Sequence, residues 1–193
     1  MSKNVSRELI KLVKSTPGVA SGVKGKFLLR ISQDKLSRSE NPKSHFGTYF
    51  LPFNSQTKEV FLIHHKKSGL WLSPGGHMET GELPLETLIR EAKEELGLTI
   101  QPQEINPPFL LTITPIDTAG YACQEHFDIW YLLKVDEFSI NADPREFHQV
   151  KWLSIPLAKK LVTDLNSLKA LEKISMEKSE KLATRSRDRY IPT

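Results

Sequence analysis

The strongest constraint in this sequence is one short helix with an unusual density of carboxylates. Pro84 suits the first position of a helix and Gly97 the position just past its end, so the sequence predicts a helix over 85–96. Six of the 23 acidic residues in the whole chain fall within 79–95. Like charges placed so closely cost stability, and such a cluster needs a physical reason.

Three of these carboxylates, Glu91, Glu94 and Glu95, converge within about one turn, because residues three or four apart share a side of a helix. The opposite side is apolar and can be buried; it comprises Leu85, Leu88, Ile89, Ala92 and Leu96. Two explanations remain open from the residues alone. Arg90 and Lys93 balance a solvated acidic surface, or a divalent cation binds the carboxylates.

Strands are predicted on both sides of this helix, where aromatic and β-branched residues lie between turn signals. They span 47–51, 59–64, 109–114, 127–135 and 150–153. The first two form a hairpin around a turn at 54–57, and the segment 71–76 is expected to be a loop. Pro52 predicts that the first strand lies at an edge or stops there.

Helices are predicted near both ends, over 7–14, more weakly over 27–36, and in a tail after Pro156. The tail carries an apolar repeat that suits one packed side, made of Leu157, Leu161, Leu165, Leu168, Leu171 and Ile174. We therefore divide the chain into an N-terminal helical extension (1–44), a central domain (45–161) and a C-terminal helical tail (162–193).

Composition narrows the class of protein. A chain of 193 residues is expected to form one domain. No run approaches the ~18 apolar residues of a membrane span, and the charged start argues against a signal peptide, so we expect no membrane partner and a cytoplasmic location. The single cysteine, Cys123, excludes an internal disulfide and multi-cysteine zinc motifs. The formal charge is +7 over residues 1–44, −7 over residues 45–153 and +4 over residues 154–193.

An ordered motif resolves the ambiguity of the acidic helix. It reads G-x5-E-x7-R-E-hydrophobic-x-E-E-x-G-hydrophobic, and its members are Gly76, Glu82, Arg90, Glu91, Ala92, Glu94, Glu95, Gly97 and Leu98. The chain here resembles the Nudix hydrolase family, with the small Ala92 where a larger aliphatic residue is usual. The resemblance extends upstream through 64–71 and 74–77, and covers roughly 46–161.

The resemblance implies an α/β protein with the Nudix fold, an α/β/α sandwich around a mixed central sheet. It also implies metal-dependent hydrolysis of a diphosphate linkage in a nucleotide or nucleoside diphosphate derivative, with Mg²⁺ or Mn²⁺ as cofactor. The chemistry suits hard carboxylate ligands, because a divalent ion neutralises the phosphoryl oxygens and lowers the pKa of bound water.

Residue roles follow from the same resemblance. Glu91, Glu94 and Glu95 are expected to bind metal together with the backbone carbonyl of Gly75, and one of the glutamates to help deprotonate water. Arg90 is expected to orient a glutamate by ion pairing, which makes Glu91, Glu94 and Arg90 the predicted catalytic residues.

Further candidates lie outside the motif. Glu82 is expected to support the loop before the helix, and Glu146 precedes the last strand near a further metal-binding position of the family. For Glu146 an ordinary surface carboxylate is the alternative.

Side chains flanking the expected cleft are candidates for binding substrate: His65, Lys66, Trp71 and His77. For histidines beside loops the alternative is an ordinary hydrogen-bonded residue, and His64 is open to the same two interpretations. The aromatic residues Tyr49, Phe50, Trp71 and Trp130 either stack on a base or belong to the core. His126 and Asp128 alternate along one strand and so share a face.

Partners and alternatives complete the hypothesis. The substrate is expected to be a small nucleotide or nucleoside diphosphate derivative. No RNA-binding module is recognised, so nucleic acid is not an expected partner. The chain is considered a candidate homodimer. The alternative function is a non-hydrolytic nucleotide-binding or regulatory Nudix module. An isomerase on the same fold would need a suitably placed cysteine, and Cys123 lies far from the motif in sequence.

Overall fold

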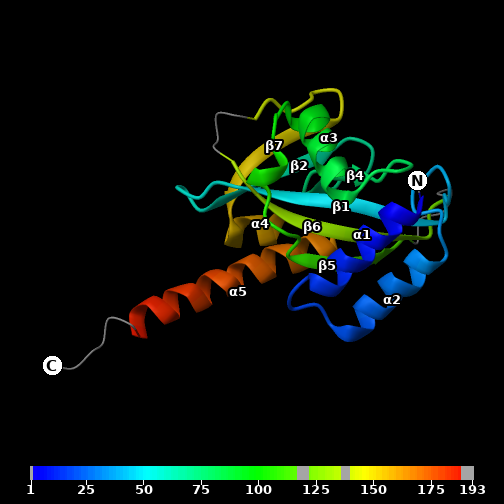
Figure 1. The fold of residues 1–193 in the computed structure, drawn as a ribbon. Coiled ribbons are helices and arrows are strands. Elements are labelled where there is room, and N and C mark those ends of the chain that lie inside the picture. Colours follow the sequence, from blue (N-terminus) through cyan, green and yellow to red (C-terminus); the bar gives the residue numbers. More distant parts are fainter. Residues whose placement is uncertain (1, 117–121, 136–139, 188–193) are drawn as a thin grey trace.

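The centre of the molecule is a mixed β-sheet (Figure 1). The computed structural model describes residues 2–116, 122–135 and 140–187, and within these ranges the sheet has seven strands. They are β1 (Ser44–Phe53), β2 (Glu59–His65), β3 (Trp71–Leu72), β4 (Gly75–His77), β5 (Leu110–Pro115), β6 (Glu125–Lys134) and β7 (Phe147–Ser154). The main order is β3-β2-β1-β6-β5, while β4 pairs with β1 and β7 pairs with β2.

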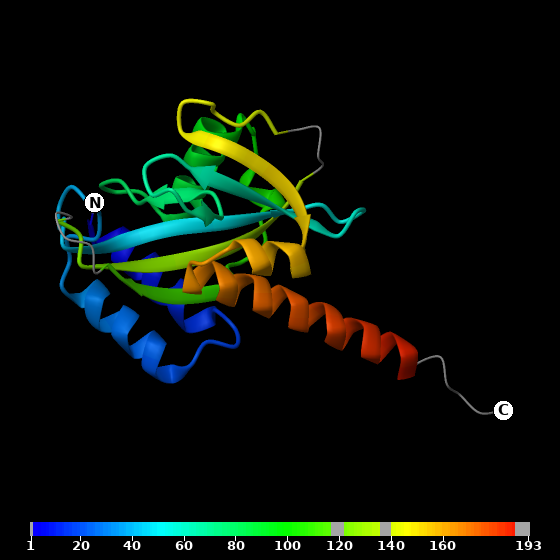
Figure 2. The ribbon, with the colours of Figure 1, turned by 180° about the vertical axis from the view of Figure 1, so that it is seen from behind.

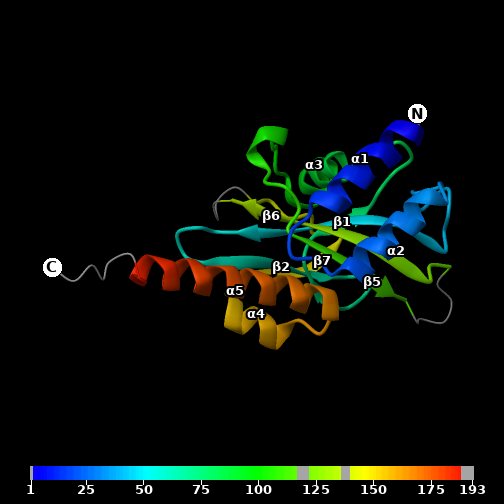
Figure 3. The same cartoon turned by 60° about the horizontal axis from the view of Figure 1, so that its bottom comes forward.

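Helices cover both faces of the sheet (Figures 2 and 3). One apolar core joins the sheet to α1 (Ser2–Ser15), α2 (Ser21–Ser32) and α3 (Pro84–Leu96). A second core joins the other face to α4 (Ile155–Leu161) and α5 (Leu165–Arg187). A short 3-10 helix, η1 (Pro102–Glu104), follows α3. The expected α/β/α sandwich with a mixed sheet is thus confirmed.

β1 is the central strand. It runs parallel to β6 along its whole length, from Ser44 opposite Glu125 to Phe53 opposite Lys134. The prediction that Pro52 marks an edge or an end is wrong. β1 pairs with β4 up to Tyr49 and with β2 at Phe53, so Pro52 falls in the gap between these two ladders, where its missing N–H leaves no bond unmade.

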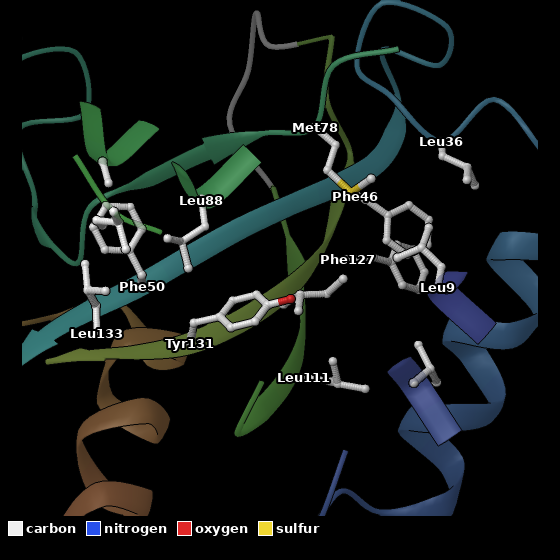
Figure 4. Packing of buried hydrophobic residues seen from close by; sticks show 14 of the residues in the cluster. Leu9, Leu36, Phe46, Phe50, Met78, Leu88, Leu111, Phe127, Tyr131 and Leu133 are labelled. Atoms are coloured by element: carbon white, nitrogen blue, oxygen red, sulfur yellow. The ribbon is translucent and has the colours of Figure 1, made fainter. Parts of the chain in front are cut away.

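The first core includes the two helices that precede the sheet (Figure 4). Leu9 of α1 and Phe27 of α2 are fully buried. The Phe27 ring packs edge-on against Phe46, at 5.9 Å between centroids, and against Phe127, at 5.1 Å. α1 and α2 therefore complete the packing of the β1–β6 pair on this face.

Two predicted segments differ from the observed structure. The weak helix predicted over 27–36 is α2, which ends earlier because Asp34 and Lys35 have φ values of 54° and 52°, outside the helical range. The predicted loop 71–76 contains β3 and the start of β4, strands too short to leave a periodic pattern in the sequence.

The C-terminal tail divides into α4 and α5 rather than forming one amphipathic helix. Val162, just after α4, has an extended backbone, and this break resets the helical phase. Leu157 and Leu165 are consequently 52% and 72% exposed, contrary to the predicted packed side, while Leu171 is buried. None of the helices in the described ranges combines the length and the apolarity needed to cross a bilayer.

Candidate active site

α3 holds its acidic side in place because its other side is buried. Leu88, Ala92 and Leu96 have no exposed surface and pack into the first core. The helix begins at Pro84 and ends at Gly97, whose φ of 65° terminates it, as predicted. The carboxylates on the remaining side are therefore carried by a helix fixed on the sheet.

Glu95 points from this helix toward β4. It is only 5% exposed, and its Oε2 accepts a hydrogen bond of 2.9 Å from the Gly75 N–H. Gly75 has a φ of 142°, and a Cβ on it would lie 2.3 Å from the carbonyl oxygen of Thr48 in β1. Only glycine lets the chain pass between β1 and α3 at this point.

Glu91 lies against the next residue of the same strand. A Cβ on Gly76 would lie 2.0 Å from Oε1 of Glu91, so a larger residue here would push the Glu91 carboxylate out of its place. Glu94 differs, because its side chain is 60% exposed. The structure thus brings Glu91 and Glu95 together at the Gly75–Gly76 segment and places Glu94 at the outer rim.

Arg90 connects these carboxylates to the loop before the helix. Its Nε and Nη2 donate to the two carboxylate oxygens of Glu82, at 2.8 and 3.1 Å. Nη1 donates to Glu91 at 2.8 Å and to Glu94 at 3.2 Å, and Nη2 also donates to the backbone carbonyl of His77 at 3.1 Å. One guanidinium therefore orients the loop and two of the predicted metal ligands.

Hydrogen bonds keep the pKa of Glu82 low, unlike the pKa values of the two carboxylates deeper in the site. Burial alone acts to raise the pKa of Glu82, but hydrogen bonds from Arg90, the Glu79 N–H and Thr87 outweigh it and hold that pKa below the usual range. The same bond from Arg90 to Glu82 raises the pKa of Arg90. Glu82 and Arg90 thus form a permanently charged pair that braces the loop.

The pKa values of Glu91 and Glu95 are raised, in contrast to that of Glu82. Burial, reinforced by the negative charges of Glu91, Glu146 and Glu94, raises the pKa of Glu95 to about 9. Burial also raises the pKa of Glu91, despite its bond to Arg90. Two buried carboxylates side by side are costly to ionise without a neighbouring positive charge.

This donor set fits a divalent metal ion. The side chains of Glu91 and Glu95 supply oxygen ligands beside the main chain of Gly75, and hard cations such as Mg²⁺ prefer oxygen. A bound cation would offset the burial and the carboxylate repulsion that together raise both pKa values. The close approach of the Gly75–Gly76 main chain leaves the two carboxylates and the backbone within one small region.

Glu146 joins this region from a distant part of the sequence. The Lys66 N–H donates to its backbone carbonyl at 2.9 Å, and Lys66 Nζ donates to the carbonyl of Pro144 at 2.6 Å. The charge of Glu146 contributes to the raised pKa of both Glu91 and Glu95. The loop that carries Glu146 is therefore held beside the acidic side of α3.

The predicted substrate-binding side chains near β2 make contacts of their own. The Trp71 ring stacks on His64, with centroids 5.0 Å apart and planes 9° apart, and Lys151 Nζ lies 4.9 Å from the Trp71 centroid. His65 Nδ1 is 3.3 Å from Ser68 Oγ. These contacts position Trp71 and His65 on the surface beside the Lys66 loop.

The other aromatic candidates divide between core and surface. Phe50 and Trp130 are buried, and Trp130 Nε1 donates to Thr112 Oγ1 at 2.8 Å, as a core tryptophan does. Tyr49 is partly exposed and stacks on Trp130 at 5.0 Å. Solvent reaches only part of Tyr49, because its ring packs against the second core and burial raises the pKa of its hydroxyl well above the usual value.

His77 gathers with two other histidines rather than with the β2 side chains. Its ring contacts His45 of β1 and His126 of β6, each at 4.7 Å between centroids. Burial, together with the neighbouring imidazoles, lowers the pKa of His77 to about 3 and that of His126 to about 4. Sequence reasoning missed His45, because no local pattern shows that β1 and β6 lie side by side.

The fold and site together define a known class. The family model described as NUDIX domain matches residues 43–172, and the chain belongs to the Nudix family. The match contains the complete acidic helix, the Gly75–Gly76 segment and the loop of Glu146.

Two curated relatives illustrate the range of this class. The m7GpppN-mRNA hydrolase NUDT17 of Xenopus laevis is 31% identical over 123 residues, which are 56% of this chain and 41% of that protein. The probable DHNTP pyrophosphohydrolase of Lactococcus lactis subsp. cremoris is 32% identical over 114 residues, 57% of this chain and 66% of that protein. The chain therefore matches less than half of the frog protein's length and just under two thirds of the bacterial one's.

Solved structures agree on the fold. The E. coli dihydroneopterin triphosphate pyrophosphohydrolase has a TM-score of 0.60 at 20% identity, over 68% of this chain and 95% of that one. A hydrolase of the NUDIX family from Clostridium perfringens has a TM-score of 0.54 at 27% identity, over 68% and 97%. The parts of this chain outside the shared region lie chiefly at its two ends.

Proposed function

We propose that this chain is a hydrolase that cleaves a diphosphate linkage in a nucleotide or nucleoside diphosphate derivative with the help of Mg²⁺ or Mn²⁺. The single observation that carries the proposal is the pair formed by the buried Glu95 and the partly buried Glu91, held against the Gly75–Gly76 main chain. A nucleotide-binding surface alone has little use for such negative charge opposite phosphate. Membership of a family with named pyrophosphohydrolases supports the same activity.

The metal ligands in this proposal are the carboxylates of Glu91, Glu94, Glu95 and Glu146 and the carbonyl of Gly75. A bound Mg²⁺ or Mn²⁺ supplies charge neutralisation at the diphosphate and lowers the pKa of a coordinated water.

The chain's own groups do the remaining work. Arg90 orients the carboxylates of Glu91 and Glu94 through hydrogen bonds from its Nη1. A carboxylate oxygen of Glu91 or Glu94 takes the proton of the attacking water. We therefore assign Glu91, Glu94 and Arg90 as the catalytic residues.

Substrate recognition is assigned to the side chains beside this helix. We propose that His65, Lys66 and Trp71 face the substrate, with Lys66 near the phosphates. His77, which the sequence also suggested for this role, is not assigned to it, because its ring lies against His45 and His126. The hydrogen bonds of Lys66 to the Glu146 loop support this placement, because they hold it beside the acidic side of α3.

The domain division and the cellular location of the chain are also proposals. We retain the division into an N-terminal extension (1–44), a Nudix domain (45–161) and a C-terminal tail (162–193), with α5 as the element available for a homodimer. The absence of a membrane-crossing helix among the described residues is compatible with a cytoplasmic location.

The test is hydrolysis of a substrate panel by the purified chain with and without Mg²⁺. The panel contains dihydroneopterin triphosphate, a dinucleoside tetraphosphate, 8-oxo-dGDP, ADP-ribose and capped RNA, with a coupled phosphatase for products that lack free phosphate. Capped RNA tests the expectation that nucleic acid is not a partner. We expect turnover of at least one member that requires the metal.

Matched variants connect this turnover to the site. Glu95→Gln is expected to abolish it, whereas Glu59→Gln, which removes a carboxylate from β2, is expected to leave it unchanged. Binding of a panel nucleotide without hydrolysis by the wild type would instead support the regulatory module.

A further inference from the structure

Three histidines from three different strands meet at one end of the sheet, outside the acidic site. His45 lies opposite His126 in the parallel pairing of β1 with β6, and His77 lies in β4, which pairs with the other edge of β1. The three ring centroids are 4.7 Å apart in every pair. One ligand nitrogen from each ring lies within 4.8 Å of the others.

One of these separations matches that of two ligands around one small cation. A tetrahedral zinc ion with bonds of about 2.05 Å to nitrogen holds two such nitrogens about 3.3 Å apart. The Nε2 atoms of His77 and His126 are 3.2 Å apart. Two imidazoles placed this way need either a proton or a metal ion between them, since two lone pairs facing each other repel.

The imidazole of His45 is also oriented to bind a metal ion. Its ring is fully buried, and its Nδ1 lies 3.0 Å from the backbone carbonyl of Asn41. A carbonyl only accepts, so Nδ1 carries the proton and the lone pair of Nε2 points away from Asn41. An imidazole held by a backbone carbonyl through its second nitrogen is the usual arrangement of a metal-binding histidine.

The surrounding chemistry selects the type of metal. Imidazole nitrogen suits zinc and its neighbours in the transition series, whereas Mg²⁺ prefers oxygen. The thiol of Cys123, a soft donor, lies 3.8 Å from Nε2 of His45. The cluster therefore differs in donor type from the carboxylate site on α3.

We propose that His45, His77 and His126 form a second metal site, selective for Zn²⁺ over Mg²⁺, beside the loop that leads to α3. The site connects three strands at the end of the sheet. His77 lies one residue beyond Gly76, and its carbonyl accepts from Arg90. Zinc binding would therefore anchor β4, the strand that leads into the Glu82 loop and α3.

The experiment titrates ZnCl₂ into the metal-free full chain by calorimetry in the presence of millimolar Mg²⁺, which occupies the carboxylates. We expect one Zn²⁺ per chain and a rise in thermal midpoint. His45→Gln and His126→Gln are each expected to weaken zinc binding by about 100-fold. His148→Gln removes an exposed histidine from β7 and is expected to bind zinc as the wild type does.

A second variant separates this site from the proposed catalytic one. Glu95→Gln is expected to retain zinc binding even where it abolishes hydrolysis. Loss of zinc binding in Glu95→Gln with full binding in both histidine variants would overturn the proposal, and so would the absence of zinc binding in the wild type.

A measurement on the wild-type chain guards against variants that fail to fold. X-ray absorption at the zinc edge is expected to show three nitrogen ligands at about 2.0–2.1 Å. A spectrum with oxygen ligands alone would refute the three-histidine site.

Discussion

The N–H of Gly75 donates a 2.9 Å hydrogen bond to Oε2 of Glu95, which joins the three-residue strand β4 to the acidic helix. This bond links two residues that are twenty positions apart in the chain. Arg90 in the same helix donates to Glu82 in the loop before α3 and to the carbonyl of His77 in β4, so hydrogen bonds connect the strand, the loop and the helix. The geometry of the carboxylates therefore depends on backbone positions as much as on the carboxylates themselves.

Substituting Gly76 by alanine tests this dependence. The new Cβ would lie 2.0 Å from Glu91 Oε1, so the carboxylate must swing away. A displacement of this size in a catalytic group is expected to lower kcat by about 100-fold. Steady-state kinetics on the best substrate of the panel measures it.

A glycine in open space serves as the control. Gly25 lies in α2 with nothing within 4 Å of a Cβ, and Gly25→Ala is expected to leave kcat unchanged and to stabilise the fold by about 0.5–1 kcal/mol. Equal losses of activity in Gly76→Ala and Gly25→Ala would contradict the proposed contact.

Arg90→Lys is expected to lower kcat by about 10- to 100-fold while the chain stays folded. A lysine cannot form the two-pronged bond to Glu82 and reach Glu91 and Glu94 at once. Lys93→Ala, an exposed change on the same helix, is expected to have no such effect.

The Glu82→Gln variant completes a double-mutant cycle for the same pair. Because Glu82 acts through Arg90, the double variant is expected to be little worse than Arg90→Lys alone. Fully additive losses would show that the two residues work independently.

The N-terminal helices are predicted to be part of the stable fold. Phe27 is fully buried against Phe46 and Phe127, so Phe27→Ala is expected to lower the free energy of unfolding by about 3–5 kcal/mol. Leu29, two residues later, is 63% exposed, and Leu29→Ala is expected to change it by less than about 0.5 kcal/mol. Urea unfolding distinguishes the two, and a small effect of Phe27→Ala would mean that α2 is dispensable.

Glu40 gives a pH-dependent prediction. Hydrogen bonds from the Ser37 hydroxyl, at 2.7 Å, and from the Ser37 N–H, at 3.1 Å, hold the pKa of Glu40 below its usual value. Because the folded state favours the ionised form, this stabilisation is complete above the unfolded pKa and is lost as pH falls through the lowered one.

Urea unfolding at pH 7 and at pH 4 measures this loss. Glu40→Gln is expected to be less stable than the wild type at pH 7, and the difference is expected to shrink at pH 4. In a Ser37→Ala background, which removes the hydroxyl bond and keeps the backbone N–H, the substitution should have a smaller effect at pH 7, and an unchanged effect there would show that the hydroxyl does not contribute.

Features that depend on neighbouring residues in sequence were predictable. The bounds of α3 follow from Pro84, Gly97 and a 3.6-residue period, all of which lie within one short segment. The pairing of Glu91 with Glu95 needs only helix geometry. Their contact with the Gly75–Gly76 main chain was not predictable, because it depends on how β4 docks between β1 and α3.

Features that depend on distant pairing were missed. Pro52 looked like the end of a strand, yet the parallel partner β6 continues the ladder on the other side. His45 carried no local signal, since its neighbours His77 and His126 come from other strands. Leu157 and Leu165 fitted one helical repeat, but the break after α4 turned both toward solvent.

The parallel pairing of β1 with β6 has a consequence for biosynthesis. Ser44 and Glu125 are neighbours in the sheet although 81 positions separate them in the chain. Closing a loop of that length is entropically costly and slows folding. In a nascent chain the backbone edge of β1 that pairs with β6 stays unpaired until β6 has been made. Unpaired strand edges favour aggregation, so the interval between the synthesis of β1 and that of β6 is the stage at which this chain is most exposed to it.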